Sequence, residues 1–200
     1  MLNNAVNFTM IKDLAKFWER EFDNFPPEAH NLKHKFMDRW VRFHSLPDSK
    51  RYPENEQEYL EVIHRHNVVL HELVGNCNLL VVLPEYSESK EPTKPESKLA
   101  AIFPTTEPWC SLEQYEEDDD YELYWHFHVS EVHFTGSELN SLFRLVANDE
   151  AGNIMIINPS KSVIFHPYDG GADVVLASTK QRDHLKEKHK EWLSSHPDGF

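Results

Sequence analysis

The last third of the chain contains the pattern that most restricts its fold. Three short apolar runs are separated by two strong turn signals: the runs are residues 154–157, 162–166 and 173–177, and the turns are Asn158-Pro159 and Asp169-Gly170-Gly171. Short apolar runs bounded by such residues are typical of β-strands joined by tight turns. The sequence therefore predicts an antiparallel three-stranded meander, with a glycine of the second turn taking a positive φ and Asp169 capping that turn with its side chain.

Four segments repeat their apolar residues at the spacing of an amphipathic helix. They are residues 9–22, 55–74, 136–148 and 178–195. Three of them begin with a capping side chain followed three residues later by Glu or Gln: Asn55 with Glu58, Thr135 with Glu138, and Ser178 with Gln181. Such pairs are typical of helix N-termini.

Strands are expected in four other runs, at residues 36–45, 78–83, 99–103 and 121–134. The order of helices and strands predicts an α+β fold, in which helices pack on an antiparallel or mixed sheet that ends in the meander. We expect a single domain over residues 1–200, interrupted by an acidic, proline-rich insertion at about residues 85–120.

The charge of the chain excludes several classes of function. With 34 acidic and 20 basic side chains, the formal net charge is −14. A protein that holds nucleic acid or an anionic membrane spreads Lys and Arg over the contact face, so neither is expected as a partner. The six glycines form no phosphate-binding loop or nucleophile elbow. We expect no cofactor, and without an export signal or a long apolar segment a cytoplasmic location.

Three segments carry a resemblance to known sequences. They are Arg39–Glu54 (RWVRFHSLPDSKRYPE), Arg65-His66-Asn67 and Phe165–Val174 (FHPYDGGADV). In these segments the chain resembles a family of small bacterial proteins known only as a domain of unknown function. The resemblance implies a bacterial, intracellular protein of α+β fold and no particular activity, so the function has to be argued from the site.

The acidity is concentrated in one part of the chain. Residues 85–122 carry twelve acidic side chains against three lysines, which gives −9 of the total −14. Carboxylates mixed with aromatic rings can form a binding surface for a basic protein, such as a toxin blocked by an immunity or antitoxin-like protein. The alternative is a solvated loop. The candidate partner-binding residues are Glu116, Glu117, Asp118, Asp119, Asp120, Trp109 and Tyr121.

A hydrolase or a metal-dependent enzyme is the alternative to a binding protein. His126 and His128 lie two residues apart on one strand and could offer two imidazoles to a metal, with Asp118–Asp120 as further ligands. The other interpretation of the two histidines is a solvated polar face of the sheet.

The second candidate group for an enzyme comes from two separate strands. Arg42 and His44 could bind an anion and act as acid or base, and His166 and Asp169 could complete a cluster if the fold brings the strands together. The alternatives are ion pairs with the chain's own carboxylates, such as Glu54, and a purely structural turn.

Overall fold

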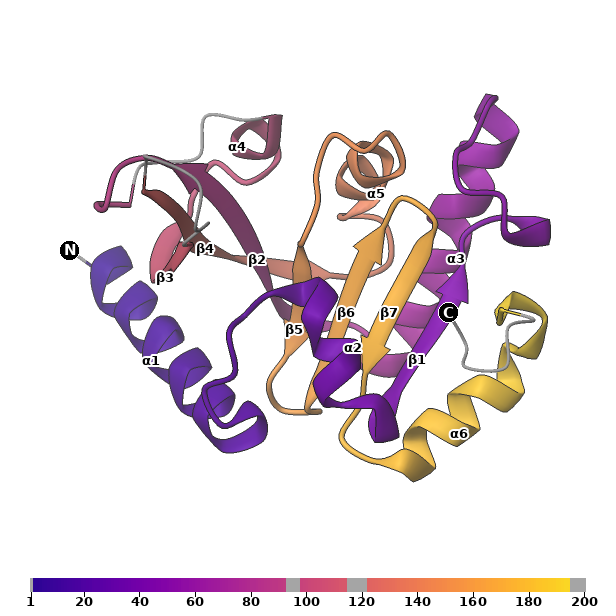
Figure 1. Ribbon diagram of the computed structural model, residues 1–200, viewed down its shortest axis with the longest axis horizontal. Helices are drawn as coiled ribbons and strands as arrows, with labels where there is room; N and C mark the ends of the chain where they lie inside the picture. Colours follow the sequence, from indigo (N-terminus) through magenta and orange to yellow (C-terminus); the bar gives the residue numbers. More distant parts are fainter. Residues whose placement is uncertain (1, 93–97, 115–121, 195–200) are drawn as a thin grey trace.

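The computed structural model describes residues 2–92, 98–114 and 122–194. Seven strands form one sheet in the order β1-β7-β6-β5-β2-β4-β3, and all neighbours are antiparallel (Figure 1). The strands are β1 (Trp40–His44), β2 (Cys77–Ser87), β3 (Glu107–Gln114), β4 (Leu123–Phe134), β5 (Met155–Asn158), β6 (Val163–Tyr168) and β7 (Gly171–Val175). The predicted α+β fold is confirmed, and the meander is β5-β6-β7.

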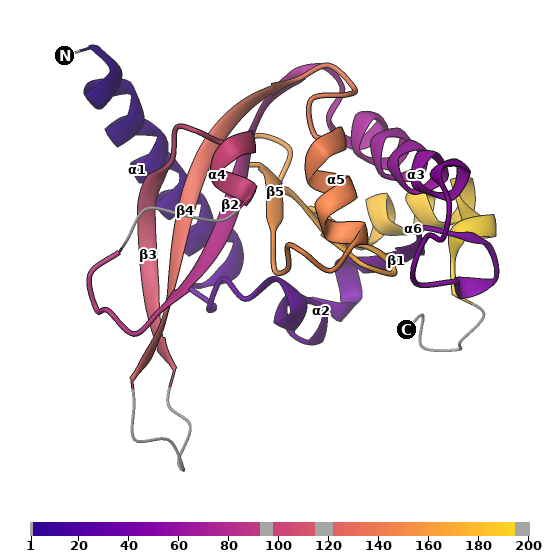
Figure 2. The ribbon, with the colours of Figure 1, turned by 90° about the horizontal axis from the view of Figure 1, so that it is seen from above.

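Helices cover both faces of the sheet (Figure 2). α1 (Leu2–Phe22), the 3-10 turn η1 (Ala29–Asn31) and α2 (Leu32–Lys35) pack on one face, and α3 (Glu56–Val74), α4 (Lys98–Ile102), α5 (Asn140–Ala147) and α6 (Thr179–Lys188) pack on the other. Each face has its own apolar layer, and burial of these two layers is the main favourable contribution to folding. No helix within the described residues is long and apolar enough to cross a membrane.

Two of the predicted helix caps are confirmed. The Asn55 side chain accepts a hydrogen bond from the Glu58 amide at 3.1 Å, and Ser178 accepts one from Gln181 at 3.3 Å. The third helix was expected at residues 136–148 but begins at Asn140. Thr135 does bond to Glu138, yet this pair stabilises a turn before the helix, because Gly136 has a φ of 135° that a helix does not allow.

Two expectations for the insertion are wrong. Residues 99–103 were expected to be a strand but form most of α4, in which Leu99 and Phe103 are buried four residues apart on one side of the helix. The edge strand of this region is β3, which was not expected. Its pairing with β4 shifts between Pro108 and Cys110, and this irregularity removes the alternation that indicates a strand.

The β6–β7 turn also differs from the expectation. Neither Gly170 nor Gly171 has a positive φ. A glycine is required at 171 for a different reason: a Cβ atom there would lie 2.0 Å from the Phe43 carbonyl oxygen of β1. The glycine therefore allows β1 and β7 to approach each other closely.

Candidate functional site

Two groups of polar residues that the sequence singled out lie on one face of three neighbouring strands. β7 runs between β1 and β6, and its Asp173 is paired with Arg42 on one side and with His166 on the other. Residues directly opposite each other in an antiparallel pair point to the same face. His44 lies two residues further along β1 on that face, and Asp169 lies in the turn after β6. The fold thus brings the four predicted residues together.

These side chains line a hollow of about 480 Å³. The same strands carry an apolar row, Trp40, Val175 and Ile164, which belongs to the layer under α1 and α2. The polar rows lie next to it, where the face is left open. The hollow has a size typical of small-molecule sites. Its twelve lining residues are His30, Lys33, Arg42, His44, Ser49, Arg51, Asn153, His166, Tyr168, Asp169, Gly170 and Asp173.

Arg42 is held in a fixed position by Asp173. Its Nε and Nη2 donate hydrogen bonds of 2.7 and 2.8 Å to the two carboxylate oxygens. The guanidinium also lies 4.7 Å from the ring centre of Tyr168 and 5.5 Å from that of Trp40. Pairing with a carboxylate of the chain, one of the alternatives for this cation, is therefore present. Asp173 leaves the hydrogens on Nη1 unused.

A backbone contact fixes the tautomer of His166. Its Nδ1 lies 2.8 Å from the Ile154 carbonyl oxygen, which can only accept, so Nδ1 carries the hydrogen and Nε2 keeps its lone pair. Burial is the main cause that lowers the pKa of His166, and the charge of Asp173 opposes it. The imidazole is therefore uncharged at neutral pH, the form that acts as a base.

The neighbouring ionisable groups also respond to Arg42. The pKa of His44 is lowered by burial first and by the Arg42 charge second, and the pKa of Lys33 is lowered by the same two causes in the same order. Among the described residues, the buried Nε2 of His44 has no hydrogen-bond partner. Burial and the Arg42 charge thus both disfavour a further positive charge on His44 and Lys33.

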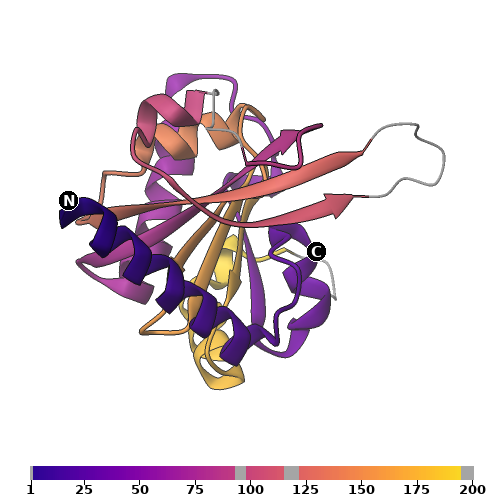
Figure 3. The same ribbon diagram turned by 90° about the vertical axis from the view of Figure 1, so that its left-hand side faces the viewer.

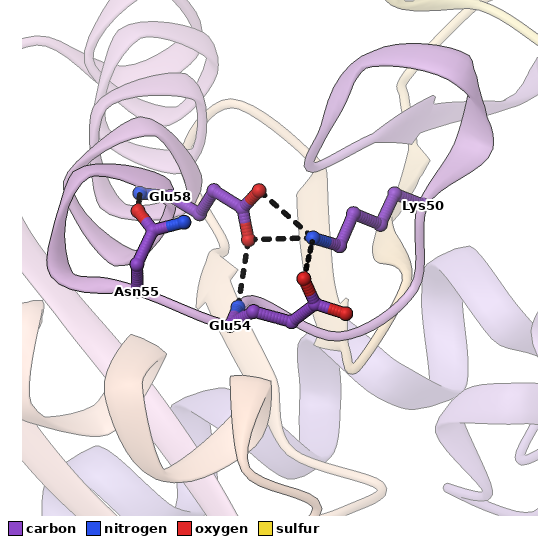
Figure 4. A network of polar contacts seen from close by, with 4 residues as sticks. All are labelled: Lys50, Glu54, Asn55 and Glu58. Carbon is purple, nitrogen blue, oxygen red and sulfur yellow. Dashed lines mark hydrogen bonds and ion pairs between the residues drawn. The ribbon is translucent and has the colours of Figure 1, made fainter.

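The loop between β1 and α3 forms another wall of the pocket through Ser49 and Arg51. Arg51 Nε lies 2.5 Å from a carboxylate oxygen of Asp169, which bonds to the loop instead of capping its own turn. Lys50 anchors the loop to α3: its Nζ lies 2.8 Å from both Glu58 oxygens (Figure 4). Glu58 also accepts a hydrogen bond from the backbone of this loop. The wall is therefore fixed by ion pairs.

Two residues of the pocket have a left-handed backbone conformation. Ser49 has a φ of 56° and Asn153 a φ of 53°, both in the left-handed region. Asn153 accepts a hydrogen bond of 2.7 Å from His30 and lies 3.2 Å from the hydroxyl of Tyr86. This conformation costs about 1 kcal/mol or more at Ser49, whereas asparagine adopts it readily.

The candidate metal ligands lie elsewhere and are buried. His126 and His128 are 0% and 3% exposed, so the expected solvated face of the sheet is wrong; α4 packs on this side. Both ring nitrogens of His126 have partners, at 2.7 Å from the Ser111 hydroxyl and 2.8 Å from the Ser89 carbonyl oxygen. Within the described ranges, no three His, Cys, Asp or Glu side chains are arranged to hold a metal. Asp118–Asp120 lie outside those ranges.

Most of the candidate partner-binding surface also lies outside the described residues. This applies to residues 116–121, which include all five carboxylates and Tyr121. Trp109 is described and is half-buried on β3. Its ring meets that of Trp18 in α1 at 5.3 Å, so it takes part in the fold.

Three residues of the pocket had no recognisable signal in the sequence. His30 comes from η1, Lys33 from the short helix α2, and Asn153 from the loop before β5. None belongs to a motif. Only the position of α2 over β7 brings Lys33 to Arg42 and Asp173.

Comparison with known sequences places the pocket within a family. The model of DUF3885, a domain of unknown function, matches residues 29–197. No curated protein and no solved structure matches the chain. The matched range contains every residue that lines the pocket, whereas α1 precedes it. The chain belongs to the DUF3885 family.

Proposed function

We propose that this protein binds a small organic anion in the pocket between β1, β7, β6 and α2. The observation that carries the proposal is the convergence of Arg42, Lys33 and Arg51 on one hollow, beside two histidines of lowered pKa. Arg42 is already oriented by Asp173, so little conformational entropy is lost when Nη1 meets a carboxylate or a phosphate.

The net charge of the chain does not oppose this proposal. Charges further away than about 8 Å are largely screened at physiological ionic strength, so the groups inside the pocket determine the interaction. The wider field of a protein with charge −14 instead discourages large polyanions. A small anion that fits the hollow is favoured over nucleic acid.

Binding of inorganic phosphate tests the proposal. We expect phosphate to raise the melting temperature of the protein at constant ionic strength, whereas chloride does not. At a phosphate concentration of 100 times the Kd, the stabilisation is about 2.7 kcal/mol. Arg51→Gln should weaken this effect, because it removes a positive charge from the lining of the hollow. The Arg51 side chain is largely exposed, so we expect the protein to tolerate its loss.

Lys35→Gln is the matched control, since Lys35 lies in α2 but is exposed and outside the pocket. It removes one positive charge without touching the lining. An equal phosphate effect in wild type, Arg51→Gln and Lys35→Gln would show that phosphate does not bind in this hollow.

The enzymatic alternative uses the same pocket. A bound anion would lie beside His166 Nε2, a neutral base, with Arg42 to stabilise developing negative charge. His44 and Asp169 line the same hollow. These contacts favour acid–base chemistry on a small ligand over a metal-dependent reaction at His126 and His128.

Binding of a basic protein is a second candidate function. The ends of β3 and β4 nearest the acidic residues project beyond the rest of the sheet (Figure 3). Glu113 and Glu122 at these ends are exposed. β3 belongs to the stretch of net charge −9, and its projecting end is accessible to a large basic surface. In this proposal, the protein acts inside a bacterial cell as an immunity or antitoxin-like partner.

Affinity capture from a bacterial lysate, followed by a salt titration, tests the second candidate. We expect one basic protein whose association rate falls steeply as salt rises, because charge complementarity acts mainly on the encounter rate. The absence of any specific partner at low salt would contradict it.

A further inference from the structure

His166 has one ring nitrogen in use and one open. Nδ1 donates a hydrogen bond to the Ile154 carbonyl oxygen at 2.8 Å, so Nε2, at the other edge of the ring, carries a lone pair. The residue is 5% exposed and lines the hollow. Among the described residues, no hydrogen bond reaches Nε2. The pocket therefore contains an acceptor that has no donor.

The donors of Arg42 lie beside this acceptor. The ring of Tyr168 contacts both groups: its centre lies 4.7 Å from the Arg42 guanidinium and 6.3 Å from the centre of the His166 ring. Asp173 is the cross-strand neighbour of both residues, and it binds only Nε and Nη2 of the guanidinium. A ligand that accepts the hydrogens on Nη1 is therefore close to His166.

His30 repeats this arrangement at the rim of the hollow. Its Nδ1 lies 2.7 Å from Oδ1 of Asn153, which only accepts, so Nδ1 carries a hydrogen and Nε2 of the neutral ring carries a lone pair. The charge of His30 contributes to the lowered pKa of His166, so the two rings are near each other. The hollow thus offers acceptors as well as cations.

This combination selects among anions. The oxygens of a fully ionised carboxylate or of sulfate have lone pairs only, so next to His166 Nε2 two acceptors would face each other. A buried acceptor without a donor is costly, and a site built to hydrogen-bond a hydroxyl rejects the analogue that lacks it. An anion with an O–H group can give its charged oxygens to Arg42 and its hydrogen to His166.

We propose that the pocket takes a small anion with an O–H group beside its charge, either a 2-hydroxy acid or hydrogen phosphate, and that His166 accepts the hydrogen bond from this group. The inference rests on the proposed anion-binding function. It adds the chemical class of the ligand and the residue that selects this class, while Arg42 binds the charged oxygens.

Two pairs of anions that differ by one O–H group test the proposal. Slightly above neutral pH, hydrogen phosphate and sulfate are both tetrahedral dianions, and only phosphate carries an O–H. Malate and succinate are both four-carbon dicarboxylates, and only malate carries a hydroxyl. Calorimetry at constant ionic strength measures the Kd of each anion. In at least one pair we expect the member with the O–H to bind about tenfold or more tightly, and that pair identifies the source of the group.

His166→Asn removes the open acceptor. The amide nitrogen of asparagine can take the place of Nδ1 and keep the hydrogen bond to Ile154. We expect this variant to bind the two members of each pair about equally. The matched control is His64→Asn, because His64 is exposed on α3 and lies outside the hollow, so this variant should keep the preference of wild type. The comparison of anions in wild type remains a test even if His166→Asn does not fold.

The outcomes separate this proposal from the one on which it rests. Equal affinity within both pairs in wild type, with weaker binding of all four anions to Arg51→Gln, would overturn selection by the O–H group and leave the anion site intact. A preference that survives in His166→Asn would overturn the role of His166, because another group would then recognise the hydroxyl. The absence of binding by all four anions would overturn the anion site itself.

Discussion

Replacement of Gly171 by alanine tests how the two strands of the pocket are held together. The added Cβ would lie 2.0 Å from the Phe43 carbonyl oxygen and 3.0 Å from its carbon. Non-bonded carbon and oxygen atoms need more than 3 Å, so β1 has to move by about 1 Å or more, enough to break hydrogen bonds to β7. β1 is an edge strand with no other neighbour. Two or three lost bonds at about 1 kcal/mol each, plus partial exposure of Phe43, give a destabilisation of about 3 to 5 kcal/mol.

Urea denaturation followed by tryptophan fluorescence measures this loss. The matched control is Gly152→Ala: nothing lies within 4 Å of a Cβ there and φ is not positive. We expect the control to lie within about 0.5 kcal/mol of wild type. Because β1 carries Arg42 and His44, Gly171→Ala should also lose stabilisation by phosphate. A loss below about 1 kcal/mol would refute the close-approach argument, since such a value fits an ordinary surface substitution.

Three further outcomes follow from single contacts. Asp173→Asn should lower the free energy of unfolding in urea by about 3 kcal/mol, because it leaves Arg42 partly buried without its counter-charge. Phosphate should stabilise this variant more than wild type. An equal effect on both proteins would mean that phosphate binds elsewhere. Asn55→Ala should cost about 1 kcal/mol by removing the cap of α3, and no change would mean that water replaces the cap. Burial lowers the pKa of His66 from 6.5 to about 3. Between these two pH values the unfolded chain binds a proton that the folded chain does not, so the free energy of unfolding falls as the pH falls from 6.5 to about 3. His66→Leu should flatten that fall by at most about 1.4 kcal/mol per pH unit, and an unchanged slope in pH-dependent denaturation would contradict the assignment.

The parts of the fold that the sequence predicted are those fixed by neighbouring residues. The α3 cap joins Asn55 to an amide three residues away, and the α6 cap at Ser178 has the same span. The meander depends on two turns whose residues are contiguous. Interactions this short form in the same way in many folds, so their patterns carry over to an unfamiliar chain.

The failures involve elements whose conformation is decided by distant contacts. A run of five apolar residues at 99–103 fits a strand or a buried helical turn equally well. Leu99 and Phe103 join the layer formed by β2 and α5, and this packing selects the helix. β3 depends on pairing with β4 through an irregular register, and no pattern in residues 107–114 alone predicts that pairing.

The candidate site was predictable in its members but not in its assembly. Arg42, His44, His166 and Asp169 were recognisable because their residue types can bind anions and move protons. Their convergence depends on β7 lying between β1 and β6, a property of strand order that local patterns do not encode. The sequence therefore indicated which residue types could bind an anion or move a proton, and the strand order of the sheet showed that these residues lie together.

The ion pair at Arg42 shows why the structural and functional interpretations of a buried charge are not exclusive. A pair with a carboxylate of the chain was the alternative to an anion site. The pair that forms, with Asp173, uses only Nε and Nη2 of the guanidinium. Burial lowers the pKa of Lys33 and of His166, and the charge of Asp173 opposes this only in part. The contact that holds Arg42 in the fold leaves the hydrogens on Nη1 for the anion that we propose.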